Sequence, residues 1–587
     1  ASALALRPAT HGSVGAFKPF PSLQRHPSRC LASSFPLPRQ PVPPLAQTLE
    51  RYLRSLEVLV TPEELEETRQ LVQEFGAPGA EGERLQAQLE RRAARMENWL
   101  SDWWVQSAYL ESRLPLTVHS SPAVVLPKQD YSDWRGQLRW VLGGAGLEGS
   151  LCPMSLTSPP RQALLVEYRG GHPQCMAQYS RLFASCRLPG PKHDGLLLPP
   201  AGRRAPTFIT VVRNFQFFQL EVYNSDGTPL TVDQLHLQLQ RIRGLSWKTD
   251  KEPLGVLTGD HRHTWGQAYS TLMRDRLNRE SARCIQRSLF TVCLDAPVLK
   301  VSDERYPSRV AAQMLHGGGS YSNSGNRWFD KTLQFIVGED GVCGVLYEQA
   351  LVDGAPIATI IDHVLDYCKD PDTARAPMTP LPLPPKLYFY ITPEIKWDIE
   401  RAKQNLDMYG PPSYPLYCCH PLMAAHQADM GPCPPTNTHS CSLPSPCPGM
   451  LGGDPFKGGS SGLLSCLLIG GHQRWGVQVG WRLGCRQGEG TWGWPPPHPA
   501  LPTPQVASRS DCLMVYGPQV PDGYGVCYNP LDAHVNFAIT AFNCCRETHA
   551  QRLAHTLQRV LDQLARLLGE SPGGAGGEGG GDVEGQP

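Results

Sequence analysis

The chain has 587 residues, and its 54 Lys and Arg are balanced by 54 Asp and Glu, so the formal net charge is zero. This balance gives no electrostatic reason to expect nucleic acid or an anionic membrane surface as a partner. No apolar run reaches the roughly 18 residues that a spanning helix needs, so we expect no transmembrane segment. The length allows two or more domains, and 19 cysteines on so long a chain favour a reduced compartment over a disulfide framework.

The first 49 residues contain no Asp or Glu, while they carry several serines and five basic side chains: Arg7, Lys18, Arg25, Arg29 and Arg39. This composition is typical of a mitochondrial transit peptide, and the alternative is a disordered N-terminal arm. We therefore predict a mitochondrial location. The last three residues, Gly-Gln-Pro, are not a peroxisomal signal.

Helical patterns follow. Residues 45–60 have a helical pattern, and Thr-Pro-Glu-Glu at 61–64 predicts a new helix with an N-cap, a proline at the first position and a capping-box Glu. Residues 83–104 are expected to form one longer helix. Residues 147–165 contain three prolines and three serines, so we predict a loop there.

Strands enter next. Residues 208–212 and 216–223 are predicted to pair, and Thr231 is predicted to cap a helix that ends at Leu245. A glycine-rich loop begins at His316. Strands at 332–337 and 342–348 follow, joined by Asp340-Gly341, the dipeptide that a type I′ hairpin turn prefers. The second strand delivers Gln349 to its C-terminal end. Strands alternating with helices predict α/β layers.

The pattern changes after this region. The proline-rich residues 376–385 are predicted to be a linker, before a short strand at 388–391 and a helix at 393–406. Residues 408–504 hold seven cysteines, four tryptophans and long Pro and Gly clusters with no lasting helix or strand period. The Gly-rich residues from 569 onward are predicted to be disordered.

Several motifs together resemble the carnitine/choline acyltransferase family: MLHGGGS at 314–320, NSGNRWFDKTLQFIV at 323–337, GVLYEQA at 344–350, ENWLSDWW at 97–104 and SSPAVVLPKQD at 120–130. The match stops after Asp407 and resumes at Gln505. The family fold implies two α/β domains with mixed sheets flanked by helices, and an active-site tunnel between them.

On this basis the second domain is truncated. We assign the segments as follows: a transit-like or disordered N-terminus at 1–40, an N-terminal acyltransferase domain at 41–385, remnants of the C-terminal domain at 386–407 and 505–568, an unrelated low-complexity insert at 408–504, and a disordered tail at 569–587.

The resemblance also implies site residues. Gln349 stands where the family has its catalytic histidine, and Asp353 stands where an acidic residue orients that histidine. Trp104 and Tyr109 match the carnitine pocket, and Tyr516 matches an aromatic residue that faces the trimethylammonium group, as the ring quadrupole favours. Taken alone, each aromatic side chain fits a hydrophobic core equally well, and Asp353 fits a turn.

Two further positions bear on the acyl donor. Met514 matches the methionine that fills the acyl channel in the acetyl-specific branch, since extra methylenes find no space in a packed site. Gln505 matches a residue that contacts coenzyme A. The family's Ser-Thr-Ser run before that glutamine, which serves the oxyanion and carnitine, is Pro-Thr-Pro at 502–504 here.

The resemblance thus implies reversible acetyl transfer between acetyl-CoA and carnitine in fatty acid metabolism, by a monomer that uses coenzyme A as a substrate and needs no cofactor. One alternative is an inactive family member or a faulty gene model, in which residues 408–504 are non-coding sequence. The other is choline as the acceptor. His316 and His363 are predicted to be structural rather than substitutes for the missing base.

Two other signals are rejected. Gly-Gly-Ser-Ser-Gly at 458–462 fits the nucleophile-elbow pattern of hydrolases, but no strand precedes it and no helix follows it in the sequence pattern. The cysteines and histidines between 418 and 447 lack paired C-x₂-C spacing, so no zinc site is predicted.

Overall fold

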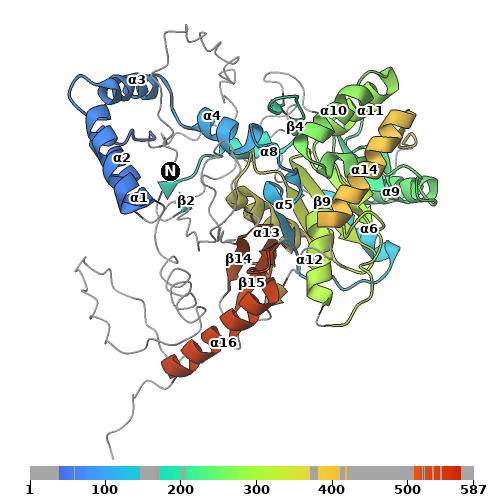
Figure 1. The fold of residues 1–587 in the computed structure, drawn as a ribbon. Helices are drawn as coiled ribbons and strands as arrows, with labels where there is room; N and C mark the ends of the chain where they lie inside the picture. Colours follow the sequence, from blue (N-terminus) through green and yellow to red (C-terminus); the bar gives the residue numbers. More distant parts are fainter. Residues whose placement is uncertain are drawn as a thin grey trace, which may run out of the picture. The chain divides into compact units, whose positions relative to one another are not determined.

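The computed structural model describes residues 37, 39–57, 60–145, 168–169, 172–199, 206–303, 305–369, 381–409, 417–419, 508–518, 520, 522–531, 534–542 and 545–569. The chain divides into two compact units (Figure 1). The first comprises Ala1–Gln106, Ala163–Ala177 and Ala201–Arg203, and the second comprises Ser107–Gln162, Gln178–Pro200 and Arg204–Pro587. Among the described residues, no helix is long and apolar enough to cross a membrane.

Several predictions concern segments outside the described residues. These are the transit-like segment up to residue 36, the loop at 147–165, the first half of the proline-rich linker, most of 408–504 and the tail after 569. The domain boundaries drawn from the sequence therefore stay predictions.

Four helices lie in the first unit: α1 (Leu45–Leu56), α2 (Pro62–Phe75), α3 (Glu81–Arg95) and α4 (Ser101–Trp104). The predicted capping box is present, because Thr61 Oγ1 accepts the N–H of Glu64 and the Glu64 carboxylate accepts the N–H of Thr61 at 2.9 Å. The single helix predicted for 83–104 is wrong. The Asn98 side chain accepts the N–H groups of Leu100 and Ser101, both at 3.0 Å, and such local bonds favour a new helix start.

An eight-stranded mixed sheet forms the core of the second unit. In sheet order its strands are β11 (Lys386–Leu387), β7 (Gln216–Glu221), β6 (Phe208–Arg213), β8 (Thr291–Asp295), β9 (Leu333–Gly338), β10 (Cys343–Tyr347), β1 (Ala123–Val125) and β13 (Leu513–Val515). The β6–β8 and β8–β9 pairs are parallel and the others are antiparallel. This confirms the predicted α/β class with a mixed sheet.

The two predicted hairpins are present. Strands β9 and β10 pair around Asp340-Gly341, with Gly341 at a φ of +81°, and β6 and β7 pair around Asn214 and Phe215. The strand predicted at 388–391 is displaced to Lys386–Leu387. Beyond it, the backbone of Tyr388 and Tyr390 bonds to side chains of a helix, since Ser281 donates to the Tyr388 carbonyl and Asn278 exchanges two bonds with Tyr390.

Helices flank the sheet on both faces: α5 (Leu116–His119), α6 (Trp134–Ala145), α8 (Ala177–Leu182), α9 (Val232–Leu245), α10 (Arg262–Leu272), α11 (Arg276–Arg287), α12 (Tyr306–His316), α13 (Gly354–Lys369) and α14 (Pro393–Tyr409). Gly344 of β10 leaves room for Met314 of α12, because an added Cβ would lie closer than 3.0 Å to its sulfur. On the opposite face, the Tyr347 hydroxyl faces Gly354, where α13 begins.

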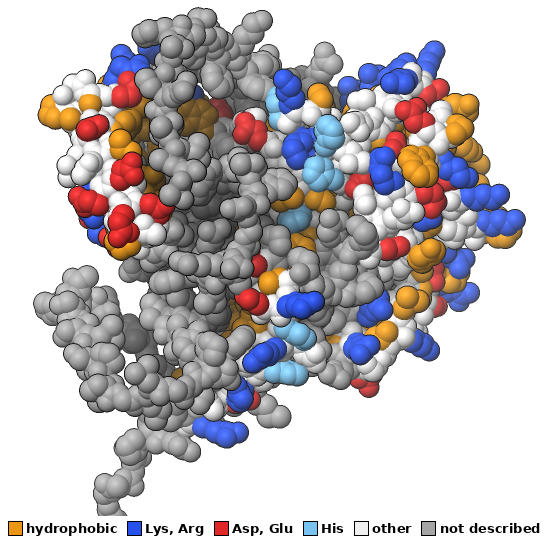
Figure 2. Space-filling model, viewed as in Figure 1, with side chains coloured by type: hydrophobic (Ala, Val, Ile, Leu, Met, Phe, Trp, Pro, Cys, Tyr) orange, Lys and Arg blue, Asp and Glu red, His pale blue; other side chains and the backbone are white. Residues whose placement is uncertain are grey.

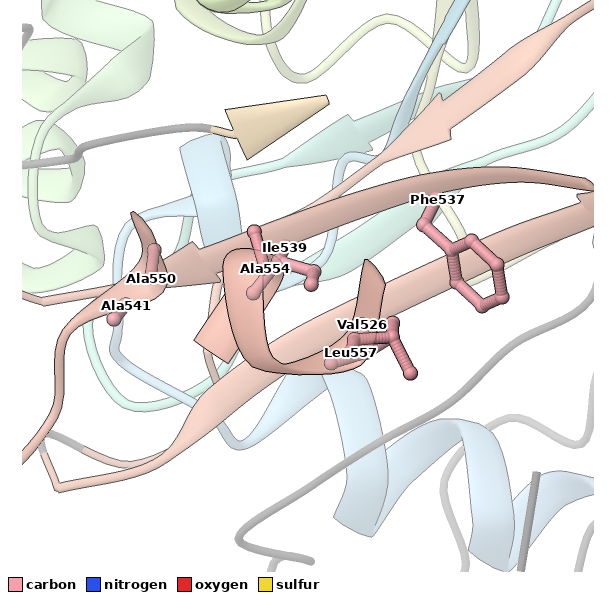
Figure 3. Close-up of a cluster of buried hydrophobic side chains, with 7 residues drawn as sticks. All are labelled: Val526, Phe537, Ile539, Ala541, Ala550, Ala554 and Leu557. Atoms are coloured by element: carbon pink, nitrogen blue, oxygen red, sulfur yellow. The ribbon is translucent and has the colours of Figure 1, made fainter. Parts of the chain in front are cut away.

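A second, three-stranded sheet is built from β12 (Tyr417–Cys419), β15 (Val535–Ala541) and β14 (Tyr524–Pro530). Helix α16 (Ala550–Gly569) runs beside it (Figure 1). Figure 3 shows the apolar seam between them, formed by Val526, Phe537, Ile539, Ala541, Ala550, Ala554 and Leu557. Strand β12 lies inside residues 408–504, where three residues are too few to show a period in the sequence.

Small ladders complete the described fold: β4 (Cys186–Leu188) with β5 (Gly195–Leu197), and β2 (Tyr168–Arg169) with β3 (His172–Pro173). Short 3₁₀ turns span Leu254–Gly259 and Ser324–Asn326, and a π-helix spans Val105–Leu110. Figure 2 shows both basic and acidic side chains on the described surface.

Candidate functional site

Strand register gathers four of the candidate residues on one face of the large sheet. Val124 of β1 lies opposite Val345 of β10 and opposite Met514 of β13. Directly opposed residues point to the same face and so do residues two apart along a strand. Met514 therefore shares a face with Tyr347. Tyr516 and Gln349 stand two residues further along their strands and continue that face.

Gln349 lies at the end of β10 and is half-buried. Its backbone N–H donates to the Ser120 carbonyl at 3.0 Å, which extends the pairing of β10 with the chain before β1. Its side-chain amide lies against the Tyr347 phenol. Burial raises the pKa of Tyr347, and the neighbouring amide offsets part of that rise. An amide does not accept a proton near neutral pH, so this position holds no general base.

Tyr347 also interacts with other predicted residues. Besides burial, electrostatic interactions with Cys527, Asp353 and Tyr109 contribute to the raised pKa of Tyr347. Asp353 is exposed, and its N–H donates to the Gln178 side chain at 3.0 Å. Tyr109 is half-buried within the π-helix, a rare form that often marks functional sites. Gln349, Tyr109 and Asp353 thus each influence the pKa of Tyr347.

A buried ion network lies behind this face, and it consists of three arginines and three carboxylates: Arg113, Arg187, Arg262, Asp194, Asp330 and Glu348. Arg187 is its centre. It donates to Asp194 at 2.7 Å, to Glu348 at 3.0 Å and to the Tyr109 carbonyl at 2.5 Å. Arg262 also binds Asp194 at 2.7 Å. Equal numbers of opposite charges allow such a group to stay buried.

This network holds the backbone on both sides of the site. The second Glu348 oxygen accepts the N–H of Ala350 at 3.1 Å, so the turn that carries Gln349 is fixed from within. Burial raises the pKa of Glu348, and Arg187 opposes that rise. Burial also raises the pKa of Asp194, but Arg262 and Arg187 more than offset it and leave this pKa below its usual value.

Met514 and Tyr516 belong to the segment that resumes the family match. Met514 is 4% exposed and Tyr516 is 7% exposed. The chain before β13 is anchored by Asp362 of α13, whose carboxylate accepts the hydroxyls of Ser508 and Ser510, both at 2.8 Å. After β13, Gly517 packs so closely on Val118 that an added Cβ would collide with it. These contacts set the position of Tyr516 on the sheet face.

Trp104 ends α4 in the first unit and is 53% exposed. Gln505 lies outside the described residues. The role of each stays a prediction.

Sequence reasoning gave no role to Arg187, Asp194, Tyr347 or Cys527. Tyr347 could have been found from period-2 alternation, since it stands two residues before Gln349 on a strand. Arg187 and Asp194 lie seven residues apart in CRLPGPKHD; Arg187 also binds residues 109 and 348, and Asp194 also binds residue 262. No local sequence pattern predicts that residues so far apart in the chain form one network.

His316, predicted to be structural, is 2% exposed at the end of α12. Burial, with Arg327 nearby, lowers its pKa to about 4. As the pH falls below 6.5, His316 takes up a proton in the unfolded chain but stays neutral in the folded chain. The free energy of unfolding therefore falls between pH 6.5 and 4.

We expect His316→Gln to reduce this loss by about 2 kcal/mol between pH 7 and pH 4.5, because roughly 2 of the 2.5 pKa units of the shift lie above pH 4.5. Urea unfolding at pH 7 and pH 4.5 measures it, and His263→Gln, which alters an exposed side chain, serves as the control. An equal pH dependence in both variants would contradict the assignment.

Comparison with known proteins gives the family. The family model described as "Choline/Carnitine o-acyltransferase" matches residues 40–410 and 497–559. Carnitine O-acetyltransferase of Homo sapiens is 45% identical over 618 residues, which cover 95% of this chain and 97% of that protein. The Columba livia carnitine O-acetyltransferase is 44% identical over 626 residues, with the same two shares. Choline O-acetyltransferase of Sus scrofa is 31% identical over 611 residues, covering 92% of this chain and 94% of its own.

The match spans both sides of the candidate site, since β10 with Gln349 and β13 with Met514 fall in its two matched segments. It leaves residues 411–496 unmatched. The chain therefore belongs to the choline/carnitine O-acyltransferase family.

Proposed function

We propose that acetyl-CoA and carnitine are the substrates of this chain, an acetyltransferase of the carnitine type whose turnover is lowered by Gln349 and by Pro-Thr-Pro at 502–504. The observation that carries the proposal is the shared sheet face of Gln349, Tyr347, Met514 and Tyr516. Identity supports carnitine over choline as the acceptor, since the carnitine enzymes are 44–45% identical and the choline enzyme of Sus scrofa is 31% identical.

The acyl side of the proposal rests on Met514. This side chain is 4% exposed and packs beside β1 on the face that Gln349 continues. A packed methionine at this place excludes extra methylenes sterically. The donor that fits is therefore an acetyl thioester, with coenzyme A as a substrate rather than a resident cofactor.

The transfer itself is direct in this proposal. An acceptor hydroxyl attacks the thioester carbonyl, and the family reaction needs a base near residue 349 to remove the hydroxyl proton. Gln349 can orient the hydroxyl by hydrogen bonding, but it does not take up its proton. Tyr347 keeps its own proton at neutral pH because burial raises its pKa. We therefore expect the chain to bind its substrates even where turnover is too slow to show it.

Equilibrium binding tests the proposal without relying on turnover. Calorimetric titration of the full chain with carnitine and with choline is expected to show tighter binding of carnitine. Tyr516→Leu, which removes the aromatic face, is expected to weaken carnitine binding about 2- to 30-fold, the range for a cation–π contact of 0.5–2 kcal/mol. Tighter binding of choline would favour choline as the acceptor. No binding of either would favour an inactive relative.

We also propose a mitochondrial location and a role in fatty acid metabolism, supported by the acid-free residues 1–49. A fluorescent reporter that carries these residues is expected to accumulate in mitochondria. The same reporter with Arg7, Lys18 and Arg25 changed to Glu is expected to stay outside. An even cytosolic distribution of the first reporter would reject the proposal.

A further inference from the structure

Four large aromatic side chains are exposed at the end of the large sheet where β11 is the edge strand. Trp247 and Trp397 are each 70% exposed, Tyr390 is 60% exposed and Tyr388 is 58% exposed. A single exposed ring is ordinary, but several together mark an interaction surface. We call these four residues the aromatic surface. Strand β11 lies five strand spacings from β10, about 24 Å, so this surface is separate from the candidate site.

The backbone that carries Tyr388 and Tyr390 is held in place. Phe389 between them points inward, since its ring packs on Phe217 and on Trp328 with centroid distances of 6.5 Å in both cases. Neighbouring side chains of an extended chain point to opposite sides, so the two tyrosines point outward. Side chains of α11 bind the carbonyls of both tyrosines. The two exposed rings therefore stand on a fixed support, which lowers the entropy that docking costs.

The loop at 247–252 connects the aromatic surface on one side to the chain after β11. Trp247 begins this loop. Lys386 of β11 lies 3.6 Å from a carboxylate oxygen of Asp250 in the loop, and 5.3 Å from the ring centre of Tyr388. One lysine thus contacts both segments and brings the first tyrosine beside the loop.

Trp397 adjoins the same loop from α14. This helix buries Ile395 and Ile399, which are 1% and 0% exposed, so Trp397 is turned outward. The neighbouring Lys396 binds Glu252 at 2.9 Å, where the loop ends. The loop therefore lies between the two tyrosines and α14, and the four rings form one surface.

The area of the aromatic surface fits a second copy of the chain. A buried Tyr or Trp side chain covers about 150–250 Å², so the exposed parts of the four rings supply on the order of 500 Å². Each partner of a standard interface buries about 800 Å². Tyr and Trp are also the residues that are enriched in interface cores and hot spots. The rings are thus large enough to form the centre of such an interface.

The charges around the rings are of both signs. Residues 247–252 and 386–397 carry four lysines and three carboxylates: Lys248, Lys251, Lys386, Lys396, Asp250, Glu252 and Glu394. A two-fold interface brings a surface against an identical surface, so charges of one sign would repel each other. A mixed set allows the lysines of one copy to approach the carboxylates of the other.

We propose that the aromatic surface is the interface of a two-fold homodimer, with the rings at its centre and the charged side chains at its rim. The two copies meet through side chains, because β11 has only two residues and the prolines at 384 and 385 before it lack an N–H for strand pairing. The inference is independent of the proposed function. It departs from the monomer that the family resemblance implies.

Sedimentation velocity of the full chain over a range of protein concentrations measures the dimer. We expect the dimer Kd to rise at least about 30-fold in Trp397→Ala, the size of one hot-spot loss. Tyr52→Ala is the matched control, because it removes a ring that is 49% exposed on α1 of the first unit, and it should leave the Kd unchanged. Circular dichroism should show the same helix content in Trp397→Ala as in the unmodified chain, since alanine favours the helix.

Amide hydrogen exchange of the full chain locates the interface. We expect residues 247–252 and 386–397 to gain protection as the protein concentration rises, while β14 and β15 exchange at an unchanged rate. A chain that stays a monomer at every concentration would overturn the inference and leave the aromatic surface to a different protein. A dimer with the same Kd in Trp397→Ala, or one that gains protection elsewhere, would also overturn it.

Discussion

Changing Gln349 to His is expected to leave the release of free thiol from acetyl-CoA plus carnitine at background, in the variant as in the unmodified chain. The change rebuilds the Tyr-Glu-His motif of the family at the end of β10. A missing base alone typically costs about 10²–10⁴-fold in rate. The missing Ser-Thr-Ser run, replaced by Pro-Thr-Pro at 502–504, is a separate loss of roughly 10²–10³-fold for an oxyanion donor.

A third loss concerns positioning. The resemblance implies that the family's contacts to the carnitine carboxylate and to coenzyme A are lost where residues 408–504 stand, and holding two reactants in line is what makes the transfer effectively intramolecular. Restoring the imidazole returns one of these three contributions. The Gln349→His variant should therefore differ little from the unmodified chain.

A thiol-release assay on purified full-length protein measures this outcome, with carnitine omitted as the blank. Gln349→Asn is the matched control, because it keeps an amide and changes only its reach. Robust carnitine-dependent turnover by Gln349→His alone would contradict the prediction. It would mean that the oxyanion and substrate contacts are supplied by residues other than those the sequence indicates.

The parts of the fold that were predicted correctly are those with local causes. Asp340-Gly341 sets its hairpin because Gly341 adopts a φ of +81°, which a glycine allows at no steric cost. Thr61 and Thr231 cap their helices because the side chain three residues later accepts the backbone N–H of the capping threonine in return. In each case the determining residues lie within four positions of one another, so the sequence alone contains the whole interaction.

One local cause was missed, because the Asn98 side chain bonds forward to Leu100 and Ser101 and so favours a new helix start within the run predicted as one helix. The other parts that were missed have distant causes. Strand β13 joins the large sheet beside β1, some 390 residues earlier in the chain, and that pairing places Met514 and Tyr516 beside Gln349. The resemblance to the family identified Met514, Tyr516 and Gln349 as candidates, but only the strand register shows that they share one face of the large sheet.

The buried network is the clearest of these distant features, and it predicts the largest effect on stability. Asp194 has no exposed side-chain surface and contacts Arg113 at 3.0 Å and both Arg187 and Arg262 at 2.7 Å. Asp194→Ala would leave two buried guanidinium groups, those of Arg187 and Arg262, and the partly exposed one of Arg113 with two carboxylates. Removing one partner of a buried pair typically costs about 3–5 kcal/mol, because an uncompensated charge stays behind.

We therefore expect Asp194→Ala to lower the free energy of unfolding by about 3–5 kcal/mol. Glu280→Ala is the matched control, because it breaks an Arg–carboxylate pair of similar length, 2.9 Å to Arg276, whose side chains are 85% and 58% exposed. Exposed pairs contribute about 0–1 kcal/mol, since water screens them. Urea unfolding of both variants at pH 7 measures the difference. Equal losses would show that the network is not held as tightly as its geometry indicates, and that Arg187 does not fix Tyr109 and the turn of Gln349 from behind.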